Sequence, residues 1–327
     1  QNAESYVTVR SGEIYNVFGA SCGGHYSGAC YEYKSDYDWE YDEPCTIRPD
    51  NQESWWNTLI WGVTQTGTSH VYVEGGRIGE IFAGGFFSNL NVGEGNRAVE
   101  MVLSGGTIGG ADLRVFGGAD HGVVTGDIYV RMEGSANILS ILVGGSNAGT
   151  VNGNIVLDLI SGTATKVEAP GKGWASAETA TIKGDVWVNL YSDFVLGKGI
   201  VDGVYVDGGI YGGKEKTNYV VIDKQGCYSR LHFAEGKEYN LASIAENGYD
   251  TSEDSIIVTG FDRFELEDKA HVMLGLGLFD ADMDPEKGSS NELVISGKGV
   301  VEIIGYGLVY KAPIVGDYGV INGYETK

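Results

Sequence analysis

The sequence repeats itself, and this repetition constrains the fold more than any other feature. Each repeat has an apolar stretch, a turn with glycine, one isoleucine, a second short apolar stretch and a turn of small residues. Three segments share this pattern: residues 7–20, 71–85 and 103–118. A second element recurs around Gly126, Gly153 and Gly184, with spacings of 27 and 31 residues. A period near 30 with short β-branched strands predicts an all-β, right-handed parallel β-helix (a β-solenoid) with about three strands per coil.

The residue types suit such coils. Alternate residues of a strand point to the same side, and Val, Ile, Leu and Phe at alternate positions predict an apolar interior. Glycine accounts for 52 of the 327 residues, about twice its usual share. We expect the recurrent glycines at corners, where φ is positive or where neighbouring coils approach closely.

The repeat also predicts how the domain is organised. It stops near Ala20 and resumes near His70, which leaves a loop insertion over residues 21–69 within a single domain of residues 1–327. In the C-terminal part the Gly-Gly turns are absent, so residues 250–327 are expected to form atypical coils or a cap. A repeat stack needs such an end because its sheet edges and core would otherwise be exposed.

The succession Gly-Gly-x-Ile (105–108), Phe-Gly-Gly (116–118) and Gly-Asp-Ile-x-Val (126–130) resembles the degenerate repeats of bacterial surface β-helix proteins. Autotransporter passengers and adhesin-like proteins of gut bacteria are the most similar groups. The resemblance covers most of residues 5–310 and brings no catalytic motif. It implies a secreted or cell-surface bacterial protein with an adhesive role. The four cysteines depart from autotransporters, which usually lack them.

The charge excludes several kinds of partner. The net charge is −23 with 22 basic residues, so no basic stripe is available to neutralise nucleic-acid phosphates. The same balance argues against anionic membrane surfaces. No apolar run reaches the roughly 18 residues of a membrane helix, so no membrane insertion is expected. The chain begins at Gln1 without a signal peptide, and we expect a mature or trimmed form of an exported protein.

The insertion carries the candidate ligand-binding residues. From position 36 to position 42 acids alternate with aromatics, so an extended strand would put acids on one face and aromatics on the other. One interpretation is a glycan-binding surface, where rings stack on sugars and carboxylates bond hydroxyls. The other is a loop whose aromatics pack on the coils while its acids face water. The candidate residues are Asp36, Tyr37, Asp38, Trp39, Glu40, Tyr41, Trp55 and Trp56.

The four cysteines allow three disulfide pairings. They are Cys22, Cys30, Cys45 and Cys227. Disulfides suit an exported protein. The alternatives are a zinc site, in which His25 joins the first three cysteines, or free buried thiols.

A calcium site is a further hypothesis. Asp280, Asp282 and Asp284 alternate as do the first ligands of a Ca²⁺ loop. Pro285 and Asn291 stand where an EF-hand needs its glycine and its bidentate glutamate. A looser Ca²⁺ site and a solvated acidic loop are both open, and no other cofactor is expected.

The leading functional hypothesis is a non-enzymatic, extracellular binding or adhesion protein that recognises a glycan or a surface protein of a host or neighbouring cell. A polysaccharide lyase or glycosidase is the alternative, and a structural stalk is a third. A glycosidase needs two carboxylates flanking the bond, but neither Asn-Thr-Asp nor Asp-Asp occurs. We expect no basic residue to cluster with acids on the recurring strands, and we expect Asp120 and His121 to form an ordinary turn.

Overall fold

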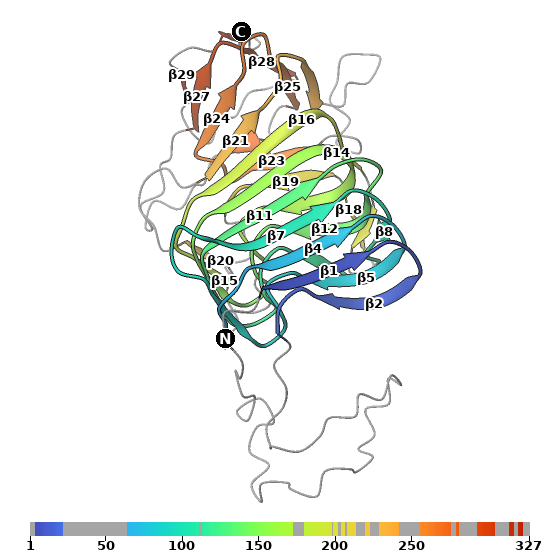
Figure 1. The fold of residues 1–327 in the computed structure, drawn as a ribbon. Helices are drawn as coiled ribbons and strands as arrows, with labels where there is room; N and C mark the ends of the chain where they lie inside the picture. The colour runs from blue at the N-terminus through green and yellow to red at the C-terminus, as the bar shows by residue number, and fades with distance from the viewer. Residues whose placement is uncertain are drawn as a thin grey trace, which may run out of the picture.

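The computed structural model describes fourteen stretches of the chain. They are residues 4–21, 64–110, 113–172, 180–197, 199–201, 204–206, 208–213, 220–222, 229–241, 256–275, 279–280, 293–304, 314–316 and 320–322. Every regular element in these stretches is a strand (Figure 1), which confirms the all-β class. Strand pairing there is parallel except for the hairpin of β17 (Gly199–Val201) and β18 (Val204–Val206). No helix in the described stretches is long and apolar enough to cross a membrane.

The longest feature is a ladder of parallel strands, each hydrogen-bonded to the next (Figure 1). We call it the first ladder and each of its strands a rung. In pairing order its rungs are β1 (Ser5–Val9), β4 (Ser69–Val73), β7 (Arg97–Leu103), β11 (Asp127–Met132), β14 (Ile155–Glu168), β16 (Val186–Leu196), β21 (Ser229–Phe233), β24 (Arg263–Leu266), β27 (Leu293–Gly297) and β29 (Ile314–Gly316).

Three further ladders complete the sheets. The second ladder contains β2 (Glu13–Phe18), β5 (Arg77–Phe82), β8 (Thr107–Ile108) and β9 (Val115–Phe116), β12 (Asn137–Val143), the end of β14, β19 (Gly209–Tyr211), β23 (Ile257–Thr259) and β26 (Phe279–Asp280). The third contains β3 (Thr64–Gln65), β6 (Asn89–Asn91), β10 (Val123–Thr125), β13 (Thr150–Asn152), β15 (Ala180–Ile182) and β20 (Val220–Ile222). The fourth contains β22 (Glu238–Leu241), β25 (His271–Gly275), β28 (Val300–Ile304) and β30 (Val320–Asn322).

The chain visits the ladders in turn. From β4 it passes to β5 in the second ladder and β6 in the third, and then returns to the first ladder as β7. Each circuit therefore places its residues beside those of the previous circuit. The stacked residues Asp127, Asn154 and Asp185 are separated by 27 and 31 positions, which confirms the spacings expected from the sequence.

The interior is apolar because alternate residues of each strand point into it. In β4, Val71 and Val73 are fully buried, whereas His70 and Tyr72 are half-buried on the other side. Among the described residues the buried positions continue from Val9 to Val301 as one large cluster, made mostly of Val, Ile, Leu, Ala, Phe and Met side chains. Each such side chain contributes roughly 1.5–3 kcal/mol by leaving water, so the interior dominates the stability.

The structure describes only part of the predicted insertion and only part of the predicted C-terminal coils. Most of the expected insertion, residues 21–69, lies outside the described stretches, and its last residues form β3 and the start of β4. Near the C-terminus the fourth ladder appears, while the third has no described strand after β20.

Stacked glycines form a corner of the circuits, as the sequence predicts. Gly12, Gly76 and Gly106 have φ of 94°, 93° and 89°. Arg77 N donates to Gly12 O, and Thr107 N donates to Gly76 O, so each corner is bonded to the next. A Cβ on Gly106 would lie 2.9 Å from Gly76 O, which leaves no room for a side chain.

We predict that Gly106→Ala lowers the free energy of unfolding by about 2–4 kcal/mol, because left-handed backbone strain adds to the clash with the corner below. Gly95→Ala is the matched control, since Gly95 also has positive φ (75°) but a Cβ added there would meet no atom within 4 Å. It should lose only about 1–2 kcal/mol. Urea unfolding midpoints measure both, and equal losses would contradict a role for close approach at the corner.

Candidate functional site

The residues singled out in the sequence lie mostly outside the described stretches. These are the ligand-binding candidates Asp36, Tyr37, Asp38, Trp39, Glu40, Tyr41, Trp55 and Trp56, the cysteines Cys22, Cys30, Cys45 and Cys227, and the calcium candidates Asp282 and Asp284. Asp280 ends β26, where only the backbone is described. Within the described stretches no three His, Cys, Asp or Glu side chains are arranged to hold a metal ion.

A different candidate site lies on the first ladder. Its outward side chains form two columns, which we call the first outer face. The first column contains Tyr6, His70, Glu100, Tyr129, Val156, Trp187, Arg230 and Arg263. The second column contains Thr8, Tyr72, Val102, Arg131, Asp158, Asn189, His232 and Glu265. Aromatic, acidic and basic side chains are thus aligned along the ladder.

At the N-terminal end of this face the aromatic rings are held by hydrogen bonds. Tyr6 is 64% exposed, and its ring lies parallel to His70 with centroids 4.3 Å apart. His70 Nδ1 donates to Glu100 Oε2 over 2.8 Å, and the Tyr72 hydroxyl donates to the same oxygen over 2.9 Å. These bonds hold the rings of His70 and Tyr72 in place on the sheet, so a ligand would meet a preformed surface.

Arg97 completes this cluster on the third and fourth rungs. Its Nη1 donates to Glu100 Oε1 over 2.9 Å, and its guanidinium carbon lies 4.1 Å from the centre of the Tyr129 ring. Burial opposes ionisation of Glu100, but the bonds from His70 and Tyr72 and the charge of Arg97 outweigh it. The pKa of the Glu100 carboxyl is therefore below its ordinary value, and the group is anionic at neutral pH.

Further along the same face, polar side chains bond from rung to rung. Asn189 Nδ2 donates to Asp158 Oδ1 over 2.6 Å, and His232 Nδ1 lies 3.1 Å from Asn189 Oδ1. Trp187 is half-buried beside them, with the Arg230 guanidinium carbon 5.2 Å from its ring centre. The face therefore alternates ring surfaces with hydrogen-bonding groups.

One sequence-based expectation about charge was wrong. Basic residues do cluster with acids on the recurring strands, as Arg97 does with Glu100 and Arg230 with Glu265. Arg97 and Glu100 are three positions apart on β7, whereas Arg230 and Glu265 become neighbours across the ladder although they are 35 positions apart. Asp120 and His121 lie in a bend between β9 and β10, and the Asp120 side chain is buried.

Asp120 belongs to a second polar cluster, beside the second ladder. Its two carboxylate oxygens accept hydrogen bonds from Asn147 Nδ2 and His121 Nδ1, each over 2.7 Å. His121 lies parallel to Phe87, with ring centroids 4.5 Å apart. Phe87 has φ of 46°, a left-handed conformation that costs a non-glycine residue energy and is frequent at functional sites.

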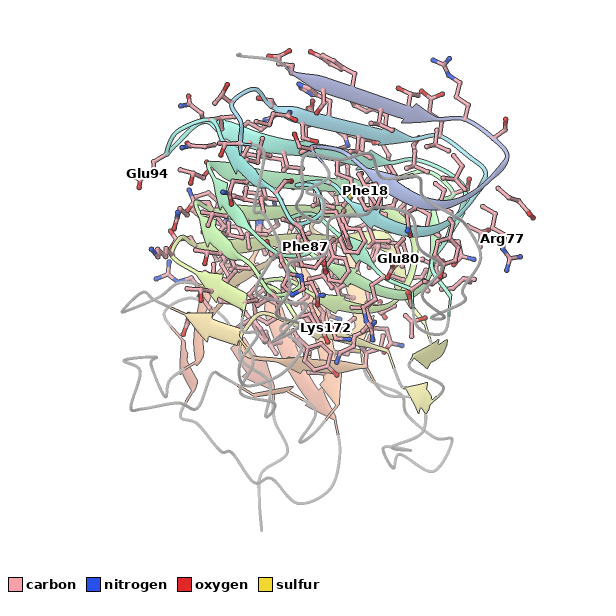
Figure 2. The ribbon with its side chains drawn as sticks, turned by 90° about the horizontal axis from the view of Figure 1, so that it is seen from below. Phe18, Arg77, Glu80, Phe87, Glu94 and Lys172 are labelled. Atoms are coloured by element: carbon pink, nitrogen blue, oxygen red, sulfur yellow. The ribbon has the colours of Figure 1, made fainter. Side chains whose placement is uncertain are left out.

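Glu80 on β5 is a third titratable side chain near this second cluster, since the charge of Asp120 acts on it (Figure 2). Burial raises the pKa of its carboxyl to about 6. The negative charge of Asp120 adds to the rise, whereas the backbone N–H and the positive charge of Arg114 oppose it. Such a carboxyl can donate or accept a proton near neutral pH, which is the property of an acid–base catalyst.

Comparison with known proteins identifies no relative: no protein family, no curated protein and no solved structure matches the chain. The candidate sites therefore depend on their own geometry. Sequence reasoning missed the first outer face, although the repeat offered a signal. Aligning the first repeats rung by rung puts Tyr6 beside His70 and Glu100 beside Tyr129.

We predict that Glu80 makes the fold less stable as pH rises. Its folded pKa of about 6 lies above the ordinary 4.5, so ionisation costs the folded state stability between these two values. The expected loss is about 1 kcal/mol between about pH 4.5 and 6.5, discounted because the carboxyl keeps some contact with water. Urea unfolding across this range should show the loss in the wild type and in Glu94→Gln, an exposed control, but not in Glu80→Gln. Identical pH profiles for all three proteins would contradict the prediction.

Proposed function

We propose that this chain is an extracellular bacterial surface protein that binds a glycan, without catalysis, along the first outer face. The observation that carries the proposal is the in-register alignment of Tyr6, His70, Tyr129 and Trp187 with carboxylates, amides and arginines. Sugar rings have an apolar face that stacks on aromatic rings and hydroxyls that bond to polar groups. A surface protein of a host or neighbouring cell is the alternative partner.

The proposal includes a finer description of the fold as a right-handed parallel β-helix. The circuits through successive ladders support it, because each circuit links two parallel neighbouring strands. Connections between parallel strands of one sheet are right-handed in about 98% of cases. The same proposal includes an exported location and disulfides among the four cysteines. It also includes a Ca²⁺ site at Asp280, Asp282 and Asp284, and a contribution to binding from Trp39, Trp55 and Trp56 of the insertion.

Rung spacing supports an extended ligand. Adjacent parallel strands lie about 4.8 Å apart, so equivalent side chains repeat along the ladder at that distance. Tyr129 and Trp187 are two rungs apart, separated by Val156, which gives about 10 Å between the two rings. A chain of sugars lying along the ladder could contact both rings at once, which gains affinity from several weak contacts.

We predict that Tyr129→Ala and Trp187→Ala each weaken binding to the best ligand of a glycan array by about tenfold or more, as for aromatic residues at the centre of an interface. The control is Tyr15→Ala, because Tyr15 is 52% exposed but lies on β2 of the second ladder. Circular dichroism checks that each variant keeps its strands. Binding that survives both substitutions, or an array without any ligand, would contradict the proposal.

A polysaccharide-degrading enzyme is the second candidate, and one specific observation favours it. Glu80 and the buried Asp120 are two carboxyl groups close enough for the charge of one to affect the pKa of the other. Glycosidases use such a pair, one member protonated and the other ionised.

If the chain is an enzyme, Glu80→Gln should lower the rate of polysaccharide cleavage by about 100-fold or more, because the amide cannot donate a proton as the carboxyl does. The measurement is release of reducing ends or of unsaturated sugars from a panel of polysaccharides, with and without Ca²⁺. Glu94→Gln should leave the rate unchanged. No release by the wild-type protein would exclude this candidate for the substrates in the panel.

A further inference from the structure

We propose that Arg230 and Arg263 form a binding site for the carboxylate of an acidic sugar, with Trp187 as the adjoining ring platform. This inference rests on the proposed glycan binding, and it specifies the ligand as an anionic glycan. The three side chains are consecutive in the first column of the first outer face, on β16, β21 and β24.

Two guanidinium groups share one carboxylate at this place. Arg230 Nη1 lies 2.9 Å from Glu265 Oε2, and Arg263 Nη1 lies 3.5 Å from Glu265 Oε1. The side chains of Arg230, Arg263 and Glu265 are 29%, 41% and 25% exposed, so the group is accessible from solvent. Two positive charges and one negative charge leave a net charge of +1.

This excess positive charge is unusual for the face and for the chain. Like charges directly opposite each other on neighbouring strands destabilise a sheet, and Arg230 is directly opposite Arg263. Two other arginines on or beside this face each have a carboxylate partner: Arg131 pairs with Glu133, and Arg97 pairs with Glu100. In a chain of net charge −23, a pair of arginines that shares a single carboxylate is therefore more useful for an anionic ligand than for stability.

The arginines also retain hydrogen-bonding capacity. A guanidinium has five N–H donors, and within the described stretches each of these two makes a hydrogen bond to a single acceptor, Glu265. The Nε atoms of both are buried with no acceptor among the described residues. The planar fork of a guanidinium matches the two oxygens of a carboxylate, so the Nη donors that Glu265 leaves unused are available to a second carboxylate.

Trp187 explains why the anion should belong to a sugar. The Arg230 guanidinium lies over the Trp187 ring, with its carbon 5.2 Å from the ring centre. The ring and the positive charge are therefore adjacent, and a sugar would stack on the part of the ring that Arg230 leaves uncovered. A sugar stacked on Trp187 would present an exocyclic carboxylate to the next rung, about 4.8 Å away, where Arg230 lies. An isolated anion would gain nothing from the ring.

The test uses four-sugar glycans in matched sets, measured by titration calorimetry with the full chain. Each set contains one sugar tetramer in four forms: the uronic acid, its methyl ester, the neutral parent and the 6-sulfate. One such set is based on the β-1,4-linked glucuronic acid tetramer, with cellotetraose as its neutral parent. The acid should bind about 10–100-fold tighter than its ester, which keeps the ring and loses the charge. This preference should decrease at high salt, because the site is partly exposed. Tighter binding of the sulfate than of the acid would assign the site to sulfated glycans and overturn the carboxylate assignment.

Three variants test the residues. Arg230→Gln and Arg263→Lys should each reduce the acid-to-ester preference by about tenfold, the second because lysine keeps the charge but loses the fork. Glu265→Gln should increase the affinity for the acid several-fold, because it removes the competing carboxylate. A purely structural role for Glu265 predicts no such gain. Arg77→Gln, which changes an exposed arginine on β5 of the second ladder, should change the preference less than about twofold.

The outcomes separate this inference from the proposed function. Equal binding of acid, ester and neutral parent would overturn the carboxylate site while leaving glycan binding intact. A preference for the acid that survives Arg230→Gln and Arg263→Lys would move the anion site elsewhere and overturn the assignment. Absence of binding to every set would overturn both.

Discussion

Parallel hydrogen bonding between successive circuits is the interaction on which everything else in this structure depends. Each strand bonds to the equivalent strand one circuit away, so residues of the same kind come to lie in columns. A column that points inward becomes a continuous apolar core, and one that points outward becomes a surface with a repeat of about 4.8 Å. The corner glycines, such as Gly76 and Gly106, allow adjacent circuits to approach closely enough for these bonds to form.

The all-β class, the circuit length and the inward positions could be predicted from the sequence, because all three follow from local patterns. Ile14, Ile78 and Ile108 follow their glycine turns by the same short distance, and the structure puts them in register. Strand alternation then assigns the buried set. None of this requires knowing which circuit lies beside which.

The candidate sites could not be predicted from the sequence, because they depend on which residues of neighbouring circuits lie side by side. The distance between stacked residues varies from 21 to 64 positions along the first ladder, so a fixed period misplaces the outward side chains. His232 meets Asn189 across 43 positions and Glu267 across 35. The cluster of the buried Asp120 is harder still to predict, since Asn147, which bonds Asp120, and Phe87, which stacks on His121, belong to connections between strands rather than to strands. The net charge of the chain was also a poor guide, because a strongly acidic chain can still hold a local group of arginines.

The pairing of the first two rungs has a wider consequence. Tyr6 on β1 pairs with His70 on β4 across 64 positions, whereas His70 pairs with Glu100 on the next rung across 30, yet both pairs keep the same register. The number of residues between two rungs therefore does not determine how the rungs align. Such a scaffold can gain, lose or exchange a whole intervening segment without moving any outward column. Selection can act on the connections and on the columns separately, as on two independent parts of one molecule.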